Sequence, residues 1–387
     1  MTETARIYLG GPVFDGRNLL HHHAALFKDG RLARIAPLET MPEGIEHINL
    51  RGQILSPGYM DLQVNGGDGI MLNEALDCEG LRRIASAHRK LGAVSILPTL
   101  ITDTPQKIRG AIAATRQAIA EGLPGIAGLH LEGPHLSVAR KGAHDATLIR
   151  PMTNDDMDLL LQAAQDLPVL MVTIAPENVT LEQADTLAQA GVILSLGHTD
   201  ASYDEALAYA GVGVRAVTHL FNAMSQLGNR APGVVGAALD HPGLSAGLIA
   251  DGIHVHPASL RSAWAAKKAS SAGQGEIFLV SDAMAPAGTS IDGFELEGRY
   301  ISRQEGRLTL QDGTLAGADL DLTTALKVLT ENCGVPLEQA LVAATGAPRR
   351  LVGAWEPGDT ALGMGEDDFI SIEADLSAVS PLTCPAD

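Results

Sequence analysis

Two histidines of this sequence lie where an apolar segment gives way to a loop. His198 follows the run V-I-L-S-L-G and His219 follows R-A-V-T, so that 219 − 198 = 21 residues separate them. A helical segment, Asp204–Ala210, lies between them, and this spacing is typical of one β–α unit. Two imidazoles at the carboxyl ends of neighbouring parallel strands can converge on one metal ion. Each could instead be a hydrogen-bonded strand-end residue, but their equivalent positions favour metal binding.

Glu132 is the third candidate ligand because it ends another apolar segment, Ile126–Glu132. A buried carboxylate is costly unless a positive charge pairs with it, and a divalent cation would provide that charge. Glu132, His198 and His219 would leave coordination positions for water and substrate, which is the pattern of a catalytic metal site. Such a metal lowers the pKa of its water and polarises a carbonyl oxygen, so the three residues predict a metal-dependent hydrolase.

Hydrolysis also needs a general base that takes a proton from water and returns it to the leaving group. Asp282 is the candidate because it follows the apolar segment Ile277–Val280, in S-D-A-M-A-P-A-G. An aspartate at this place could also cap the following turn. We predict the catalytic role because Asp282 would share the mouth of one fold with the three ligands.

Eight apolar segments recur from residue 54 onward, and helical patterns separate most of them. Eight β–α alternations predict a closed (β/α)8 barrel of the TIM type, whose chemistry lies at the carboxyl ends of its strands. An open doubly wound sheet is the alternative, but the sequence lacks the glycine-rich fingerprint that usually follows its first strand. The predicted strands are Ile54–Gln63, Val94–Leu100, Ile126–Glu132, Val169–Ala175, Val192–Gly197, Val214–His219, Leu244–Ala250 and Ile277–Val280.

Both ends of the chain have β character and predict a small β-sandwich beside the barrel. We assign residues 1–54 and 354–387 to this sandwich and residues 55–353 to the barrel. The pair Asp29-Gly30 predicts a hairpin turn within the first of these segments. A further hairpin is expected within Tyr300–Gly317, inserted after the eighth strand of the barrel.

The composition excludes several classes of partner. The 387 residues carry a formal net charge of −19, which argues against nonspecific binding to nucleic acid and against attraction to anionic membranes. No apolar run approaches the ~20 residues of a membrane-spanning helix, and the first residues do not form a signal peptide. The three cysteines have no metal-like spacing and suit a reducing compartment. We therefore expect a cytoplasmic protein.

Several motifs occur together and in a fixed order. They are P-G-Y-M-D-L-Q-V-N-G from Pro57, H-L-E-G-P-H from His130, K-G-A-H from Lys141, T-H-L-F-N-A from Thr218 and S-D-A-M from Ser281. With these motifs, nearly the whole chain resembles the N-acetylglucosamine-6-phosphate deacetylases of the amidohydrolase superfamily. The resemblance implies a (β/α)8 barrel, a flanking sandwich from both termini, and a homodimer with the active site near the subunit interface.

The resemblance also implies a role for each residue of the site. Glu132, His198 and His219 would be the metal ligands and Asp282 the proton shuttle, while His144 would face the substrate acetamide and polarise its carbonyl. In the family's dimer the phosphate-binding pair is partly supplied across the interface. The residues that match substrate-binding positions are Ala143, His144, Asn222, Ala223, Leu315, Ala316 and Gly317, with Arg230 and His254 as the phosphate-binding pair.

One metal ion per subunit is expected. Many members of the superfamily bind a second metal through H-x-H after the first strand, but this chain has Gln63 and Asn65 there. An amide is a poor substitute for imidazole at a transition metal, so we expect these two residues to support the site without binding a metal. Three nitrogen and oxygen ligands suit zinc, our first choice, and also iron, manganese or cobalt.

The predicted activity is removal of acetate from N-acetyl-D-glucosamine 6-phosphate, a step of amino sugar catabolism. The same chemistry on another N-acyl amino sugar phosphate, such as N-acetylgalactosamine 6-phosphate, is the nearest alternative, because the two sugars differ in the direction of one hydroxyl. A non-catalytic sugar-phosphate sensor on the same scaffold is a remote alternative, since such a protein would be expected to lose the base or the ligands first.

Overall fold

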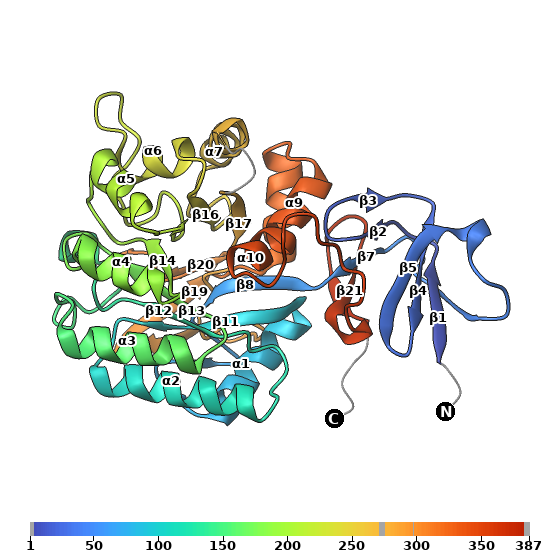
Figure 1. Cartoon of the computed structure of the whole chain (residues 1–387), viewed down its shortest axis with the longest axis horizontal. Helices are drawn as coiled ribbons and strands as arrows, with labels where there is room; N and C mark the ends of the chain where they lie inside the picture. Colours follow the sequence, from blue (N-terminus) through green and yellow to red (C-terminus); the bar gives the residue numbers. More distant parts are fainter. Residues whose placement is uncertain (1–3, 271–274, 297, 383–387) are drawn as a thin grey trace.

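The computed structural model describes residues 4–270, 275–296 and 298–382. Its centre is an eight-stranded parallel sheet in which neighbouring strands follow one another in the chain (Figure 1). The strands are β8 (Tyr59–Val64), β11 (Ala93–Ile101), β12 (Leu129–Glu132), β13 (Leu170–Ile174), β14 (Ile193–Leu196), β15 (Ala216–Val217), β16 (Ser245–Leu248) and β17 (Ile277–Leu279). The backbone N–H of Asp282 donates to the carbonyl of Gln63 at 3.0 Å and so joins the last strand to the first. The predicted (β/α)8 barrel is confirmed.

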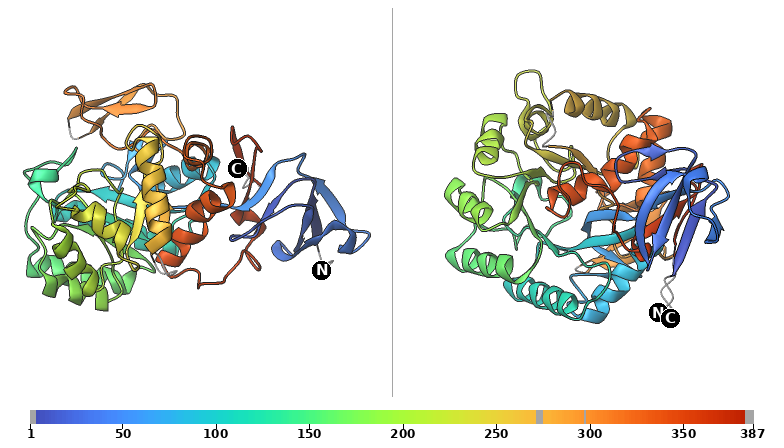
Figure 2. Two further views of the ribbon diagram at one scale, coloured as in Figure 1. Left: turned by 90° about the horizontal axis from the view of Figure 1, so that it is seen from above. Right: turned by 45° about the vertical axis from the view of Figure 1, so that its right-hand side comes forward.

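Helices connect consecutive strands and cover the outside of the barrel, as the two views of Figure 2 show. Several begin at a hydroxyl or carboxylate that caps the first turn, which is why the sequence indicates where they start. Thr153, Thr180 and Ser202 each accept from a backbone N–H three residues later. The helices are α1 (Cys78–Lys90), α2 (Pro105–Ala120), α3 (Asn154–Asp166), α4 (Leu181–Gln189), α5 (Tyr203–Gly211), α6 (Gly233–Asp240) and α7 (Pro257–Ser270).

The flanking domain consists of two sheets that pack face to face. One sheet has the order β5-β4-β1-β6 and the other the order β22-β21-β7-β2-β3, so that segments from both ends of the chain share a sheet. Tyr8, Phe27 and Phe369 meet between them, with ring centroids 5.3 and 5.1 Å apart. The strands are β1 (Ala5–Leu9), β2 (Val13–Phe14), β3 (Leu19–Leu20), β4 (His23–Lys28), β5 (Arg31–Pro37), β6 (Glu46–Asn49), β7 (Ile54–Pro57), β21 (Phe369–Ile372) and β22 (Val379–Pro381).

One predicted strand, Ile54–Gln63, is wrong as a single element. Its first half is β7, which pairs with β21 in the sandwich, and its second half is β8 of the barrel. The break falls at Gly58, where a Cβ atom would lie 2.3 Å from the Val94 side chain. The backbone N–H of Gly58 donates to Asp368 of the sandwich at 2.8 Å. The apolar run therefore continues through a point at which the chain changes sheets.

The segment after the eighth strand forms a three-stranded antiparallel sheet, β18 (Gly293–Leu296), β19 (Arg299–Gln304) and β20 (Arg307–Thr309). Figure 2 shows it projecting from the barrel in orange. The hairpin predicted within Tyr300–Gly317 is present, but the strand that precedes it, β18, was not predicted. The helices α8 (Leu322–Lys327), α9 (Leu337–Ala344) and α10 (Gly346–Leu351) follow, and the last two lie between the barrel and the sandwich (Figure 1).

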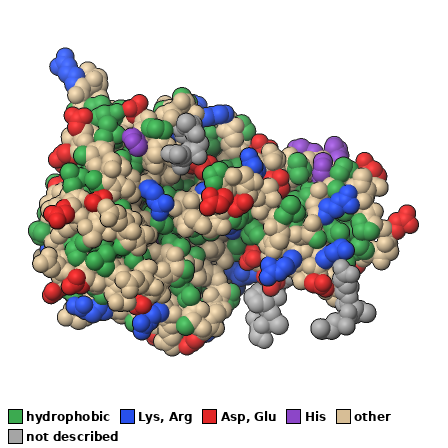
Figure 3. Space-filling model, in the orientation of Figure 1, with side chains coloured by type: hydrophobic (Ala, Val, Ile, Leu, Met, Phe, Trp, Pro, Cys, Tyr) green, Lys and Arg blue, Asp and Glu red, His purple; other side chains and the backbone are tan. Residues whose placement is uncertain are grey.

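The surface visible in Figure 3 carries acidic and basic side chains interspersed over both domains. Among the described residues, none of the helices is both long enough and apolar enough to cross a membrane.

Candidate active site

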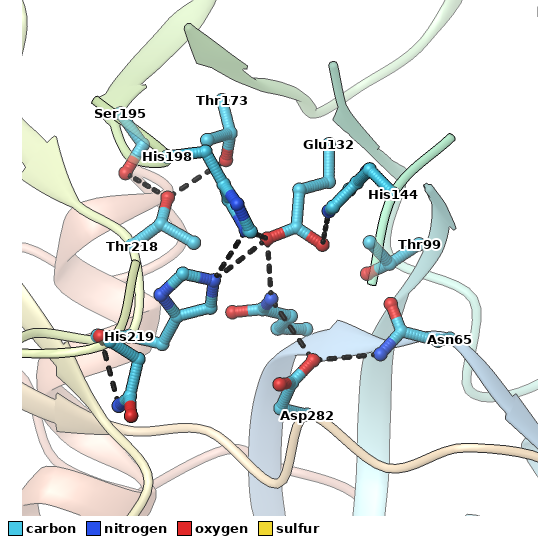
Figure 4. Close-up of polar contacts among 12 residues, drawn as sticks. Asn65, Thr99, Glu132, His144, Thr173, Ser195, His198, Thr218, His219 and Asp282 are labelled. Atoms are coloured by element: carbon cyan, nitrogen blue, oxygen red, sulfur yellow. Dashed lines mark hydrogen bonds and ion pairs between the residues drawn. The ribbon is translucent and has the colours of Figure 1, made fainter. Parts of the chain in front are cut away.

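Three side chains converge at one end of the barrel, from the carboxyl ends of β12, β14 and β15 (Figure 4). Glu132 Oε1 lies 3.0 Å from His219 Nε2 and 3.3 Å from His198 Nε2, and the two imidazole nitrogens are 3.1 Å apart. All three side chains are buried, and their ligand atoms lie within 4.8 Å of one another. The three predicted metal ligands are therefore brought together.

The backbone leaves each strand through an uncommon conformation. His198, His219 and Asp282 have φ values of 49°, 30° and 51°, in the left-handed region that residues other than glycine seldom adopt. Glu132 is followed by Gly133, with φ of 93°. Such strain persists only where the surrounding structure enforces it, and it is concentrated at functional sites. The turns direct these side chains to one point above the barrel.

The donor set fits a divalent metal ion. His198 Nδ1 lies 2.8 Å from the carbonyl oxygen of Arg140, so this nitrogen carries the proton and leaves the lone pair of Nε2 directed toward Glu132. Two imidazole nitrogens and a carboxylate oxygen are the ligands that zinc and related metals take in catalytic sites. Burial raises the pKa of Glu132, but the adjacent His198 and His219 side chains outweigh it and hold that pKa well below the usual range. Glu132 is thus ionised, as a metal ligand must be.

Asp282 lies beside the three ligands and is held by two amides. Gln63 Nε2 donates to Asp282 Oδ1 at 3.1 Å and to Glu132 Oε1 at 3.0 Å, and Asn65 Nδ2 donates to Asp282 Oδ1 at 2.7 Å. Burial and the charge of Glu132 raise the pKa of Asp282 to about 6. A carboxylate with this pKa can take up and release a proton near neutral pH, as a general base must.

His144 faces the same carboxylate from the other side. Its Nε2 lies 3.8 Å from Glu132 Oε2, and its Nδ1 accepts from the backbone N–H of Thr102 at 3.3 Å. The Thr102 hydroxyl lies 2.9 Å from the same Nδ1. Burial and the neighbouring His198 lower the pKa of His144 to about 3. His144 is therefore neutral with its proton on Nε2, the nitrogen that can donate into the cavity.

These groups line a cavity of about 550 Å³, large enough for a sugar phosphate. His254 is part of its wall, and Asp251 Oδ2 lies 2.6 Å from its Nδ1 and fixes the ring. The predicted site residues that line the cavity are Asn65, Glu132, Ala143, His144, His198, His219, Asn222, Ala223, His254, Asp282, Leu315 and Gly317.

Three predicted residues lie outside the cavity lining. Gln63 is buried behind Asp282 and Glu132, and Ala316 is buried with its backbone N–H donated to Leu308. Arg230 is exposed, on the loop between β15 and α6. Thr102 and the carbonyl of Arg140, which orient His144 and His198, were not predicted, because neither a threonine just after a strand nor a backbone carbonyl in a short 3-10 helix carries a spacing signal for that role.

Comparison with known proteins identifies the family. The family model described as "Amidohydrolase family" matches residues 54–354, and the "NagA composite domain" matches residues 8–55. The chain is 38% identical to N-acetylgalactosamine-6-phosphate deacetylase of Shewanella sp., over 92% of this chain and 90% of that protein. It is 32% identical to N-acetylglucosamine-6-phosphate deacetylase of Haemophilus influenzae, over 95% and 93%.

Solved structures agree over the whole length. N-acetylglucosamine-6-phosphate deacetylase from Pasteurella multocida superposes with a TM-score of 0.89 at 29% identity, covering 98% of each chain. A mutant of the Mycobacterium smegmatis enzyme in complex with N-acetyl-D-glucosamine-6-phosphate gives 0.87 at 28% identity, covering 98% of this chain and 97% of that one. The buried Glu132, His198 and His219, the barrel and these matches lead to one conclusion: the chain belongs to the amidohydrolase family, and within it to the group of amino sugar 6-phosphate deacetylases.

Proposed function

We propose that this protein hydrolyses the acetamide of an N-acetylhexosamine 6-phosphate and releases acetate. The observation that carries the proposal is the arrangement of Asp282 and His144 on either side of the Glu132, His198 and His219 cluster, inside one cavity. When bound to these three residues, a divalent metal ion would supply Lewis-acid chemistry, acidifying water and polarising a carbonyl.

The protein's own groups account for the proton movements. Asp282 takes a proton from the attacking water as a general base and then returns it to the departing amine as a general acid. The amides of Gln63 and Asn65 fix the Asp282 carboxyl group in place through its Oδ1. His144, protonated at Nε2, donates a hydrogen bond to the acyl oxygen as negative charge develops there. The neutral state of His144 keeps this donor in place over the whole physiological pH range.

The sugar epimer is the finer part of the proposal. We place N-acetyl-D-glucosamine 6-phosphate first, as the sequence motifs indicate. N-acetylgalactosamine 6-phosphate is the second candidate because the Shewanella relative named for it is 38% identical to this chain, against 32% for the Haemophilus relative named for the glucose epimer. Values of kcat/KM for the two sugars decide between them.

Recognition of the phosphate is proposed to need a second subunit. His254 lies in the wall of this chain's cavity, whereas Arg230 is exposed on a loop outside it. Leu227 on the same loop is 59% exposed, which suits burial against another copy of the chain. We infer a homodimer in which Arg230 enters the cavity of the partner subunit, where its guanidinium would bind the phosphate in a bidentate manner.

The decisive experiment is acetate release by metal-stripped protein after addition of one divalent metal at a time. We expect release from the phosphorylated sugars in the presence of zinc, iron, manganese or cobalt, and much slower release from unphosphorylated N-acetylglucosamine. Metal-dependent release that ignores the phosphate would remove the phosphate pocket from the proposal. No release from either epimer with any metal would contradict the proposed function.

A further inference from the structure

A chain of buried polar side chains crosses the inside of the barrel directly beneath the candidate metal ligands, and Figure 4 shows three of its members, Thr173, Thr218 and Ser195. It consists of His130 on β12, Thr173 on β13, Ser195 on β14 and Thr218 next to the end of β15, and we call it the polar belt. All four side chains are buried. The interior of such a barrel is usually filled by aliphatic side chains, so a continuous polar chain here calls for a physical reason.

The hydrogen bonds of the polar belt run in one direction. His130 Nδ1 lies 3.0 Å from the carbonyl oxygen of Leu62 on β8, and a carbonyl can only accept, so Nδ1 carries the proton. His130 Nε2 then accepts from the Thr173 hydroxyl at 2.8 Å. Thr173 in turn accepts from Thr218 at 2.8 Å, and Thr218 accepts from Ser195 at 2.6 Å. The donor and the acceptor of each hydrogen bond in the belt are therefore fixed.

The polar belt is connected to the ligands through very short stretches of backbone. His130 lies two residues before Glu132, Ser195 lies three residues before His198, and Thr218 directly precedes His219. Gly197, next to His198, packs so closely on the belt that a Cβ atom there would lie 2.8 Å from Thr173 and 2.9 Å from Thr218. A shift of any belt hydroxyl would therefore move a ligand-bearing turn.

We propose that the polar belt sets the relative positions of the three ligand-bearing strand ends, and that His130 and Thr173 are positioning residues for the metal site. This inference rests on the proposed function in so far as Glu132, His198 and His219 bind a metal ion. A fully satisfied buried network is rigid, because breaking one bond leaves a polar group without a partner in an apolar interior. Loss of one belt hydroxyl would therefore allow the side chains of Glu132, His198 and His219 to move relative to one another in the metal-free protein.

The test is the zinc dissociation constant of Thr173→Val, measured by competition with a chelator on metal-stripped full-length protein. Valine keeps the shape of threonine but removes the hydroxyl that joins His130 to Thr218. We expect zinc affinity to fall about tenfold, the lower end of the range seen when groups that orient metal ligands are removed. Thr173→Ser, which retains the hydroxyl, should bind zinc like the wild type.

The matched control is Thr115→Val on α2. The Thr115 hydroxyl is also buried, but it has no hydrogen-bond partner among the described residues, so its loss should leave zinc affinity unchanged. Equal weakening in Thr115→Val and Thr173→Val would overturn the inference, as would unchanged affinity in Thr173→Val. If Thr173→Val does not fold, Ser195→Ala removes the first donor of the belt and should weaken zinc binding severalfold.

Wild-type protein that binds none of the divalent metals would contradict the proposed function, and the role of the polar belt with it. Wild-type protein that binds zinc but releases no acetate would contradict the proposed activity alone. In that case the comparison of Thr173→Val, Thr173→Ser and Thr115→Val still tests the polar belt, because its readout is metal affinity.

Discussion

At the scale of single residues, the environment of Asp282 favours chemistry at the expense of stability. Its carboxyl is buried beside Glu132. The hydrogen bonds from the amide groups of Gln63 and Asn65 compensate only part of the free-energy cost of burying a charged carboxylate there. Two carboxylates held this close in the interior cannot both ionise freely. A base with a raised pKa is useful to a hydrolase, and it makes the metal-free protein less stable.

This arrangement predicts that Asp282→Asn lowers the activity and raises the stability of the metal-free protein. The folded-state pKa of about 6 lies above the ordinary 3.8, so between these values the folded protein holds a proton that the unfolded chain has lost. The free energy of unfolding therefore decreases as the pH rises through this window, and the whole penalty is present above pH 6. Asparagine removes it, so metal-free Asp282→Asn should be more stable than wild type at pH 8, by up to about 3 kcal/mol.

Urea unfolding of both proteins with chelator at pH 8 checks the size of the effect, which should shrink toward pH 4. The same variant should lose at least about a hundredfold in kcat, because it lacks the proposed general base. A variant that is less stable than wild type at pH 8 would contradict this account of Asp282.

Thr102 gives a second prediction, about the protonation of His144. Its hydroxyl and its backbone N–H both face His144 Nδ1, and together they keep the proton on Nε2. Thr102→Val retains the N–H but loses the hydroxyl, so a larger share of the imidazole turns or carries its proton on Nδ1. We expect kcat to fall about tenfold with little change in KM, since the acyl oxygen is stabilised mainly in the transition state.

Thr102→Ser is the matched control for this prediction and should behave like the wild type. Steady-state kinetics on the better of the two sugar phosphates gives the answer. An equal fall in Thr102→Ser, or an effect confined to KM, would mean that the threonine serves substrate binding or packing instead.

Residue types at strand ends were sufficient to predict which side chains meet. Glu132, His198, His219 and Asp282 could be predicted because carboxylates and imidazoles at the ends of apolar runs are costly to bury unless they bind a partner. Thr102 and the Arg140 carbonyl could not, because their roles depend on loop conformations that bring distant segments together. His130 shows what the sequence cannot indicate. Its place within a predicted strand indicates that it is buried, but nothing in the sequence indicates its hydrogen-bond partners on β8 and β13.

At the scale of elements, the parallel strands of the barrel were predictable because they are buried on both faces and read as continuous apolar runs. Because such a run is apolar throughout, the sequence does not indicate the break at Gly58. There the chain leaves the sandwich and enters the barrel without a polar residue between the two strands. The division of the chain at residue 55 stays a prediction, and β7 (Ile54–Pro57) lies on the sandwich side of the break.

Arg349 on α10 stabilises the junction between the sandwich and the barrel at Gly58, and it gives a third prediction. It is buried, its Nη2 donates to the carbonyl of Gly58 and its Nη1 to that of Thr345, both at 2.9 Å, and its guanidinium lies 5.2 Å from the ring centroid of Trp355. Arg349→Met would leave the buried Gly58 carbonyl without this donor, and the Trp355 ring would lose its contact with the guanidinium. We expect a loss of about 2–4 kcal/mol in the free energy of unfolding.

Chemical denaturation at pH 8 measures this loss, with Arg109→Met as the control. Arg109 is an exposed arginine of α2, so its replacement should change stability by less than about 0.5 kcal/mol. Equal effects of the two substitutions would show that Arg349 does not secure the junction between the barrel and the sandwich.

At the scale of the whole molecule, the protein must attract an anionic substrate against its own charge. The formal net charge is −19, and long-range repulsion of a phosphate follows from it. Within the cavity of one chain, Arg140 already pairs with Asp200 at 2.6 Å, which leaves it less able to compensate a phosphate. In the proposed homodimer a cation from the second subunit would resolve this conflict, and Arg230 is exposed where a partner could receive it.

Subunit complementation tests this arrangement. Arg230→Ala removes the cation and Asp282→Asn removes the base, so each homodimer should be nearly inactive on the phosphorylated sugar. In a mixed dimer, the Arg230→Ala subunit keeps its own Asp282 and would receive Arg230 from the other subunit, which rebuilds one complete site. Random reassociation of equal amounts makes half of the dimers mixed, so activity should return to about one quarter of the wild-type value.

The control is the same mixture without an exchange step, which should stay inactive because the subunits have not been redistributed. Light scattering establishes that each variant is a dimer before mixing. If Arg230 instead acted within its own chain, the mixed dimer would hold one site without the cation and one without the base, and no activity would return. Recovery therefore requires a site shared between subunits, and its absence in proven mixed dimers would place phosphate recognition within the single chain.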